Sequence, residues 1–185
     1  MNNKDNELFI SLLRDINRPQ TEELIARLES LGFFVAPASC KSNGHLPFKG
    51  GLLRHSLNTF QIAHSIAQIL RHPLITEESI IVSSLLHDVC KANRYTSLDD
   101  GTYQRNNDSM LPHSEMSLLT IMKVGYPLLD AEIAAIRWHM APFRLNQQCE
   151  DEKLAYEWAV RKYPLVTLIG CSDTISAKIV ECNML

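Results

Sequence analysis

Long apolar runs are absent from this 185-residue chain. No stretch approaches the roughly 20 apolar residues that a membrane-spanning helix needs, which excludes such a helix. An apolar signal region is also absent, because residues 1–7 are polar. A cytoplasmic protein with no membrane partner is therefore expected.

Paired cysteine motifs and an excess of positive charge are absent as well. The cysteines are odd in number, scattered and never in a Cys-x-x-Cys pair, which indicates reduced thiols rather than a disulfide framework: Cys40, Cys90, Cys149, Cys171 and Cys182. The net charge of -3 and the pI of about 6.1 give no basic face for an extended nucleic-acid surface. A mononucleotide or a short oligonucleotide remains a suitable ligand.

The hydrophobic content of 45% is sufficient for one domain with a real core. Almost all apolar residues recur with helical spacing, which predicts an all-α helical bundle. Residues 1–36 are expected to form a helical extension packed on a main domain of residues 37–185. Within the main domain, Asp99-Asp100-Gly101 between Thr96 and Tyr103 predicts one small β-hairpin.

The expected helices follow from apolar stripes and from capping and breaking residues. They cover about 8–16, 21–31, 52–70, 77–91, 112–123, 130–139, 151–162 and 164–179. Residues 33–48 are expected to be irregular.

Six potential metal ligands are dispersed along these helices: His55, His87, Asp88, His113, His139 and Asp173. Their separations of 32, 25, 26 and 34 residues each suit a helix plus a connection, so a bundle can direct all six toward one place. Imidazole and carboxylate ligands suit two divalent transition metal ions, with Mn, Fe, Ni, Co and Zn all acceptable.

Adjacent side chains on a helix differ by about 100° in direction, so His87 and Asp88 can meet one metal site only near a helix end. We expect Asp88 to bridge two ions. His55, His87 and Asp173 would complete the first site, and His113 and His139 the second. Lys91, one helical turn after His87, could hold a phosphate oxygen.

These residues resemble the HD-domain superfamily of metal-dependent phosphohydrolases. The match rests on His55, on His87-Asp88-x-x-Lys91 and on Asp173, and His113 and His139 resemble its binuclear branch. Residues 50–57 are similar to the HD domains of some bacterial 3′-to-5′ exoribonucleases, and 111–115 and 136–140 to other bacterial HD hydrolases. Two departures are Cys90, where many members have glycine, and residues 1–36, which are too short for a separate nucleic-acid-binding domain.

The resemblance implies hydrolysis of a nucleotide or another small phosphate monoester or diester through a metal-bridging hydroxide. Asp88 and Lys91 are the expected catalytic residues, and Lys91, Arg137 and His45 the expected substrate contacts. Two alternatives remain open: a di-iron oxygenase built on the same fold, and a non-catalytic nucleotide-binding domain. The oligomeric state is also open.

Overall fold

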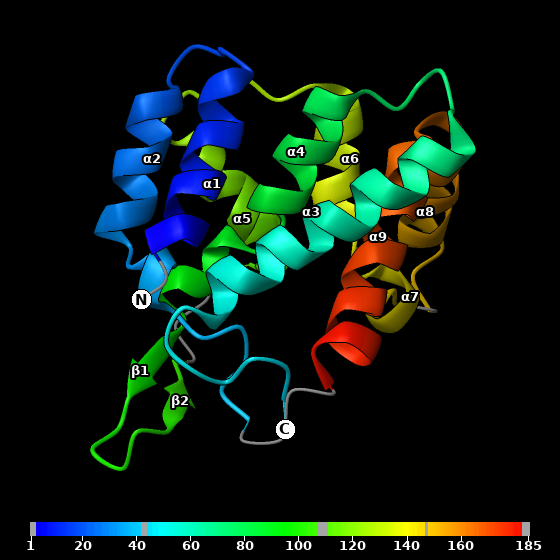
Figure 1. The fold of residues 1–185 in the computed structure, drawn as a ribbon. Coiled ribbons are helices and arrows are strands. Elements are labelled where there is room, and N and C mark those ends of the chain that lie inside the picture. The colour runs from blue at the N-terminus through cyan, green and yellow to red at the C-terminus, as the bar shows by residue number, and fades with distance from the viewer. Residues whose placement is uncertain (1–2, 42–43, 107–110, 147, 183–185) are drawn as a thin grey trace.

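The protein is a helical bundle with a small hairpin at one end (Figure 1), seen in a computed structural model that describes residues 3–41, 44–106, 111–146 and 148–182. This confirms the predicted all-α fold. The α-helices are α1 (Asn3–Asp15), α2 (Thr21–Ser30), α3 (Gly51–Leu70), α4 (Glu77–Leu86), α5 (His113–Met122), α6 (Asp130–Trp138), α7 (Ala141–Arg144), α8 (Glu150–Lys162) and α9 (Pro164–Ile175). Short 3-10 turns, η1 (Phe33–Val35) and η2 (Val89–Asn93), and a π turn, η3 (Ser176–Val180), complete the helical elements.

Helix α3 runs through the middle of the bundle and packs against α4 and α9, and α6 packs against α9 in turn (Figure 1). The main core gathers their inward-facing side chains, among them Leu52, Leu85, Leu86 and Ile136, all fully buried. Burial of each such side chain stabilises the fold by about 1.5–3 kcal/mol. Among the described residues, no helix is both long and apolar enough to cross a bilayer.

The two N-terminal helices share this core rather than forming one of their own. Phe9 of α1 is fully buried, and its ring centroid lies 5.0 Å from that of Phe33. Between α1 and α2, Arg18 forms a two-pronged ion pair with the buried carboxylate of Glu132 on α6, with N–O distances of 2.7 Å. The domain boundary at residue 37 stays a prediction, because the residues on either side of it pack together.

The predicted hairpin is present as β1 (Tyr95–Ser97) and β2 (Tyr103–Arg105), which pair antiparallel with Tyr95 opposite Arg105. Gly101 in the connecting loop has a φ of 80°, a conformation that glycine adopts without strain. The hairpin follows η2 directly and projects away from the helical bundle, at the lower left of the view (Figure 1).

The helix boundary beside the predicted ligands differs from the expectation. The helix that was predicted to continue to about Lys91 ends at Leu86, and the chain tightens into η2 from Val89. Asp88 lies between the two with φ −116° and ψ 14°, outside the helical region, so the α-helical ladder cannot continue through it. As expected, His87 and Asp88 therefore stand at a helix end.

Candidate metal centre

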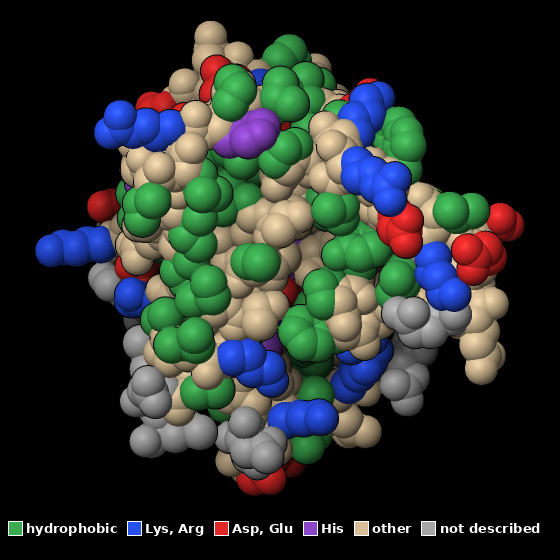
Figure 2. Space-filling view, turned by 90° about the vertical axis from the view of Figure 1, so that its right-hand side faces the viewer, with side chains coloured by type: hydrophobic (Ala, Val, Ile, Leu, Met, Phe, Trp, Pro, Cys, Tyr) green, Lys and Arg blue, Asp and Glu red, His purple; other side chains and the backbone are tan. Residues whose placement is uncertain are grey.

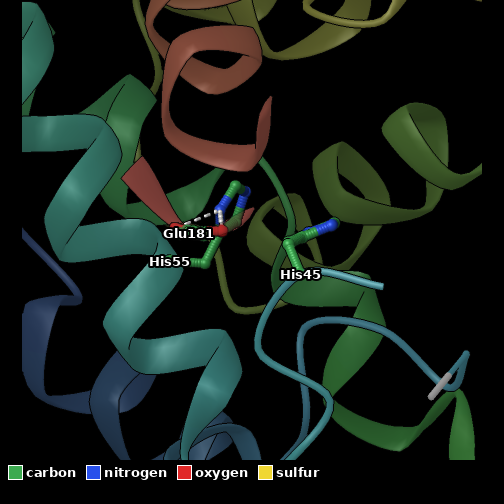
Figure 3. Close-up of side chains that lie close together, drawn as sticks. All are labelled: His45, His55 and Glu181. Carbon is green, nitrogen blue, oxygen red and sulfur yellow. Dashed lines mark hydrogen bonds and ion pairs between the residues drawn. The ribbon is translucent and has the colours of Figure 1, made fainter. Parts of the chain in front are cut away.

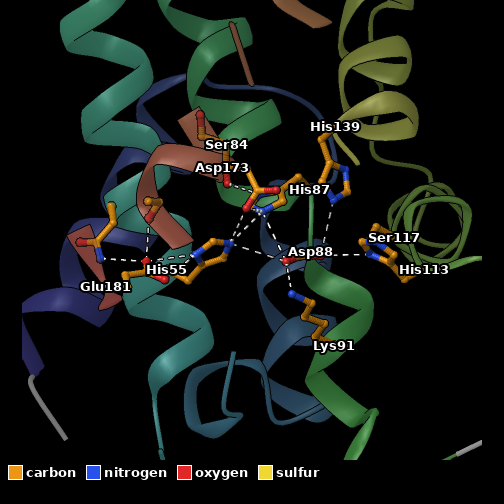
Figure 4. Close-up of polar contacts among 12 residues, drawn as sticks. His55, Ser84, His87, Asp88, Lys91, His113, Ser117, His139, Asp173 and Glu181 are labelled. Carbon is orange, nitrogen blue, oxygen red and sulfur yellow. Dashed lines mark hydrogen bonds and ion pairs between the residues drawn. The ribbon is translucent and has the colours of Figure 1, made fainter. Parts of the chain in front are cut away.

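The six predicted ligands come together at the middle of the bundle (Figure 4). His55 comes from the second turn of α3, His87 and Asp88 from the end of α4, and His113 from the first residue of α5. His139 follows α6, and Asp173 lies in α9. All six residues are buried, and none is more than 8% exposed.

Two glycines allow the close backbone approaches around these ligands. A Cβ at Gly51, the first residue of α3, would collide with the carbonyl oxygen of Leu46. A Cβ at Gly170 would lie 3.1 Å from the carbonyl oxygen of His139, so the bare backbone lets α9 approach the end of α6. These contacts bring Asp173 and His139 to the same site.

The carboxylate of Asp88 faces two different groups of ligands. Its Oδ2 atom lies 3.4 Å from Nε2 of His87 and 3.7 Å from Nε2 of His55. Its Oδ1 atom lies 3.2 Å from Nδ1 of His113 and 3.8 Å from Nε2 of His139. One carboxylate with its oxygens divided in this way is suited to contact two cations.

Asp173 lies beside the two histidines that face Oδ2 of Asp88. Its Oδ1 atom lies 3.1 Å from Nε2 of His55 and 3.8 Å from Nε2 of His87. The donor atoms of His87, His139 and Asp173 form a further group that could hold one ion, so the Asp173 carboxylate also lies within reach of the side that contains His139.

The imidazole tautomers can be deduced from the outward-facing nitrogens. Nδ1 of His87 lies 2.8 Å from the carbonyl oxygen of Ser84, and Nδ1 of His139 lies 2.8 Å from that of Ile136. A carbonyl oxygen only accepts, so each Nδ1 carries the donated proton. When such a ring is neutral, as metal binding requires, its Nε2 presents a lone pair to the centre.

Several inward-facing atoms at this centre have no hydrogen-bond partner among the described residues: Oδ1 of Asp88, Nδ1 of His113 and Nε2 of His139. The 3.2 Å approach of His113 to Asp88 lacks hydrogen-bond alignment. Buried polar atoms are rarely left unpaired, because each costs about 1–3 kcal/mol. Divalent cations would satisfy all three atoms, so the donor set fits metal binding.

The electrostatics of the side chains at this site also favour metal binding. Burial, with a contribution from the positive charge of His87, lowers the pKa of His139 to about 3, so this ring is neutral. Burial alone would raise the pKa of Asp88, but the charges of Lys91 and His87 outweigh it and hold the pKa well below its ordinary value. Asp88 is therefore ionised and His139 is neutral, the protonation states that metal ligation requires.

His55 holds a proton in the metal-free protein. Burial lowers its pKa, but hydrogen bonds to Asp173 and Glu181 raise it to about 9. Nε2 of His55 lies only 3.2 Å from Nε2 of His87. A proton on His55 therefore occupies the position where a cation would otherwise separate two lone pairs.

Glu181 is the residue that sequence reasoning missed. It follows η3, is 2% exposed, and its carboxylate oxygens lie 3.0 and 3.1 Å from Nδ1 of His55 (Figure 3). Asn58 and Ser176 also donate to it, at 3.0 and 2.6 Å. Glu181 thus fixes the His55 ring with Nε2 directed inward. No spacing pattern in the sequence predicts this contact, because Glu181 is 126 residues from His55.

The predicted substrate contacts lie at different places. Lys91 binds Oδ2 of Asp88 at 2.6 Å and lines a cavity of about 660 Å³ that opens beside the centre. His45 lines the same cavity, with its ring centroid 4.9 Å from that of His55. The donor atoms of His45, His55 and Glu181 lie within 4.8 Å of one another.

Arg137 does not line that cavity. Its guanidinium binds Glu115 at 2.7 Å and approaches Glu152 at 3.5 Å, beside a separate cavity of about 80 Å³. Its predicted contact with substrate stays a prediction, for a ligand that extends into this smaller cavity.

Comparison with known proteins agrees with the site. The HD-domain family model matches residues 52–176, which include all six candidate ligands and Lys91. The chain is also similar to the dihydroneopterin 2′,3′-cyclic phosphate phosphodiesterase of Methanocaldococcus jannaschii, with 26% identity over 135 residues. The match covers 71% of this chain and 53% of the archaeal protein, so the chain spans about half the length of that relative. No solved structure gives a significant match. The family model matches more than half of the chain, and the matched segment holds the six ligands of one buried site. The chain therefore belongs to the HD-domain family.

Proposed function

We propose that this protein is a metal-dependent phosphohydrolase that cleaves a nucleotide or another small phosphate ester at the centre described above. The observation that carries the proposal is the carboxylate of Asp88, whose two oxygens face two separate sets of histidines. Pairs of divalent ions held in this way supply a Lewis acid to phosphate oxygens and lower the pKa of water. The similarity to a cyclic phosphate phosphodiesterase supports hydrolysis rather than oxygenation.

The ligand assignment is as follows. His55, His87, Asp88 and Asp173 would hold one ion, and Asp88, His113 and His139 the other. Oδ2 of Asp88 belongs to the first set and Oδ1 to the second. Glu181 is a positioning residue, because it acts through His55 rather than on the ions.

Lys91 would bind the reacting phosphate. Burial lowers its pKa, but the charge of Asp88 outweighs burial and raises the pKa above its ordinary value, so the ammonium group stays charged. An ammonium group has three N–H donors, and the contact with Asp88 uses one of them. The others are available to a phosphate oxygen on which negative charge develops.

His45 would contact the substrate as a neutral ring. Burial, together with the positive charge of His55, lowers the pKa of His45 to about 4. Its Nε2 atom is buried without a hydrogen-bond partner among the described residues. A neutral imidazole beside the cavity can donate to or accept from an ester oxygen of the substrate.

The test is a panel of phosphate esters with the metal-loaded protein. We expect Mn²⁺-dependent cleavage of bis(p-nitrophenyl) phosphate and of nucleoside 2′,3′-cyclic phosphates, with no uptake of O₂. Substrate-dependent O₂ consumption by an iron-loaded protein would instead establish the oxygenase alternative. Binding of nucleotides without turnover, with every metal tried, would establish the non-catalytic alternative.

A further inference from the structure

The cavity beside the metal centre is strongly cationic, although the chain as a whole carries a net charge of -3. Its described lining includes one carboxylate, that of Asp173, against six cationic side chains: Lys41, Lys91, Arg94, Arg105, Arg144 and Lys178. Figure 2 shows lysine and arginine side chains gathered in the lower part of one face, near a hollow in which acidic and histidine atoms are visible.

Separate segments supply these cations. Lys41 comes from the loop before α3, Arg94 from the end of η2, Arg105 from β2, Arg144 from α7 and Lys178 from η3. Segments that are distant in sequence thus place positively charged side chains around one cavity. Such an arrangement raises the local concentration of an anionic ligand.

Five of the six cations have no carboxylate partner within the described parts of the chain. Of the six, Lys91 is the one that pairs with a carboxylate of the described residues, that of Asp88. Elsewhere on the molecule, Arg14, Arg18 and Arg137 are each bound to a glutamate at 2.7 Å. In addition, Nε of Arg94 is buried without a hydrogen-bond partner among the described residues. The outer cations are therefore available to an external anion.

We propose that these outer cations form an anion subsite for a second phosphate group, distinct from the phosphate that reacts. The inference rests on the proposed function. A reacting phosphodiester carries a single negative charge, and the metal centre with Lys91 already neutralises it. Five further cations, none with a carboxylate partner among the described residues, favour additional negative charge in the ligand, so the substrate class is a nucleotide with a second phosphate. Phe143, which is 59% exposed at the same cavity, offers a ring face to the base.

The size of the cavity agrees with this class of substrate. Its volume of about 660 Å³ lies within the range of about 300–1,000 Å³ that is usual for sites of drug-sized ligands. A nucleoside with phosphates at both ends of its sugar would place one phosphate at the metal centre and the other among the outer cations that line the same cavity. Arginine is suited to grip such a terminal phosphate with two N–H donors.

The experiment compares two ligands that differ only in the second phosphate: adenosine 2′,3′-cyclic phosphate and the same compound with a 5′-phosphate. Binding to the metal-loaded protein is measured by titration calorimetry at low temperature, where turnover is slow, and cleavage is measured in parallel with Mn²⁺ at the ordinary assay temperature. The test variant is Arg105→Gln with Arg144→Gln, two exposed side chains of the proposed subsite that are not among the proposed metal ligands. The control is Lys123→Gln, an exposed cation at the end of α5 that does not line the cavity.

For the wild type, we expect the 5′-phosphorylated ligand to bind at least about tenfold more tightly, with an advantage that shrinks as salt is added. The double substitution should remove most of this advantage and leave the affinity of the singly charged ligand nearly unchanged, whereas Lys123→Gln should preserve it. Equal affinities for the two ligands, or an equal loss in the control, would overturn the subsite. If the binding results are as expected but neither compound is cleaved with any metal, the subsite stands and the proposed function fails.

Discussion

Replacement of Glu181 by glutamine tests whether the hydrogen bond between its carboxylate and Nδ1 of His55 controls the metal affinity of the centre. The carboxylate accepts from Nδ1 of His55 through both oxygens and also accepts from Asn58 and Ser176. Glutamine keeps one accepting oxygen but places an amide N–H₂ group where the second oxygen faces the His55 donor. The negative charge is lost as well, so the His55 ring is held less firmly with its Nε2 lone pair toward the centre.

The expected magnitude follows from similar outer contacts in metal sites, whose removal usually lowers metal affinity about 10–100-fold, or about 1.4–2.7 kcal/mol. The assay is a competition between the protein and a chromogenic chelator for Zn²⁺ or Mn²⁺. Glu132→Gln is the matched control, because Glu132 is also a fully buried carboxylate with hydrogen-bonding partners but lies in an ion pair with Arg18. Unchanged metal affinity in Glu181→Gln, or the same loss in Glu132→Gln, would refute this account of Glu181.

Three further predictions follow from the geometry. Lys91→Gln should lower kcat/KM by about 100-fold while both ions remain bound, because a charge-assisted contact to the phosphate is lost; kinetics and metal analysis of the same sample check this, and full activity would contradict it. Metal-free protein should lose about 3 kcal/mol of stability as pH rises from 6.5 to 9, because the folded-state pKa of His55 is raised to about 9 and its contribution disappears as the ring deprotonates; urea titrations in chelator check this, and a flat profile would exclude it. Arg18→Leu should reduce the free energy of unfolding by about 3 kcal/mol without changing metal content, since it leaves the Glu132 charge buried and uncompensated; thermal melts with and without metal check this, and an unchanged melting temperature would show that the ion pair contributes nothing.

The helical fold could be predicted because local signals agreed with tertiary packing. Apolar stripes at helical spacing predicted most of the helices, and Asp100-Gly101 predicted the hairpin. The extent of the helix before Asp88 could not be predicted in the same way. Residues 87–91 favour a helix by their types. At Asp88, however, the backbone leaves the helical conformation, at the place where the ligands come together.

The candidate site could also be predicted only in part. Histidine and aspartate types at regular intervals identified the residues that the structure brings together, but pattern alone could not find Glu181, whose contact with His55 joins segments 126 residues apart. Nor could sequence assign the cations around the cavity. Arg137 lies in an ion pair with Glu115, whereas Arg105 and Arg144, each of which reads singly as a surface charge, line the cavity. Whether a cation pairs with a carboxylate or lines the cavity depends on tertiary contacts between distant segments, and local sequence does not determine those contacts.

The central claim is that Asp88 is shared between two cations. Elemental analysis by mass spectrometry of protein purified without added metal tests it most directly, with the Asp88→Asn variant prepared in parallel. We predict about two transition metal ions per chain in the wild type and a loss of both in the variant, because each site would lose an anionic oxygen ligand. A wild-type protein that binds no metal even after reconstitution, or an Asp88→Asn variant that retains both ions, would contradict the account.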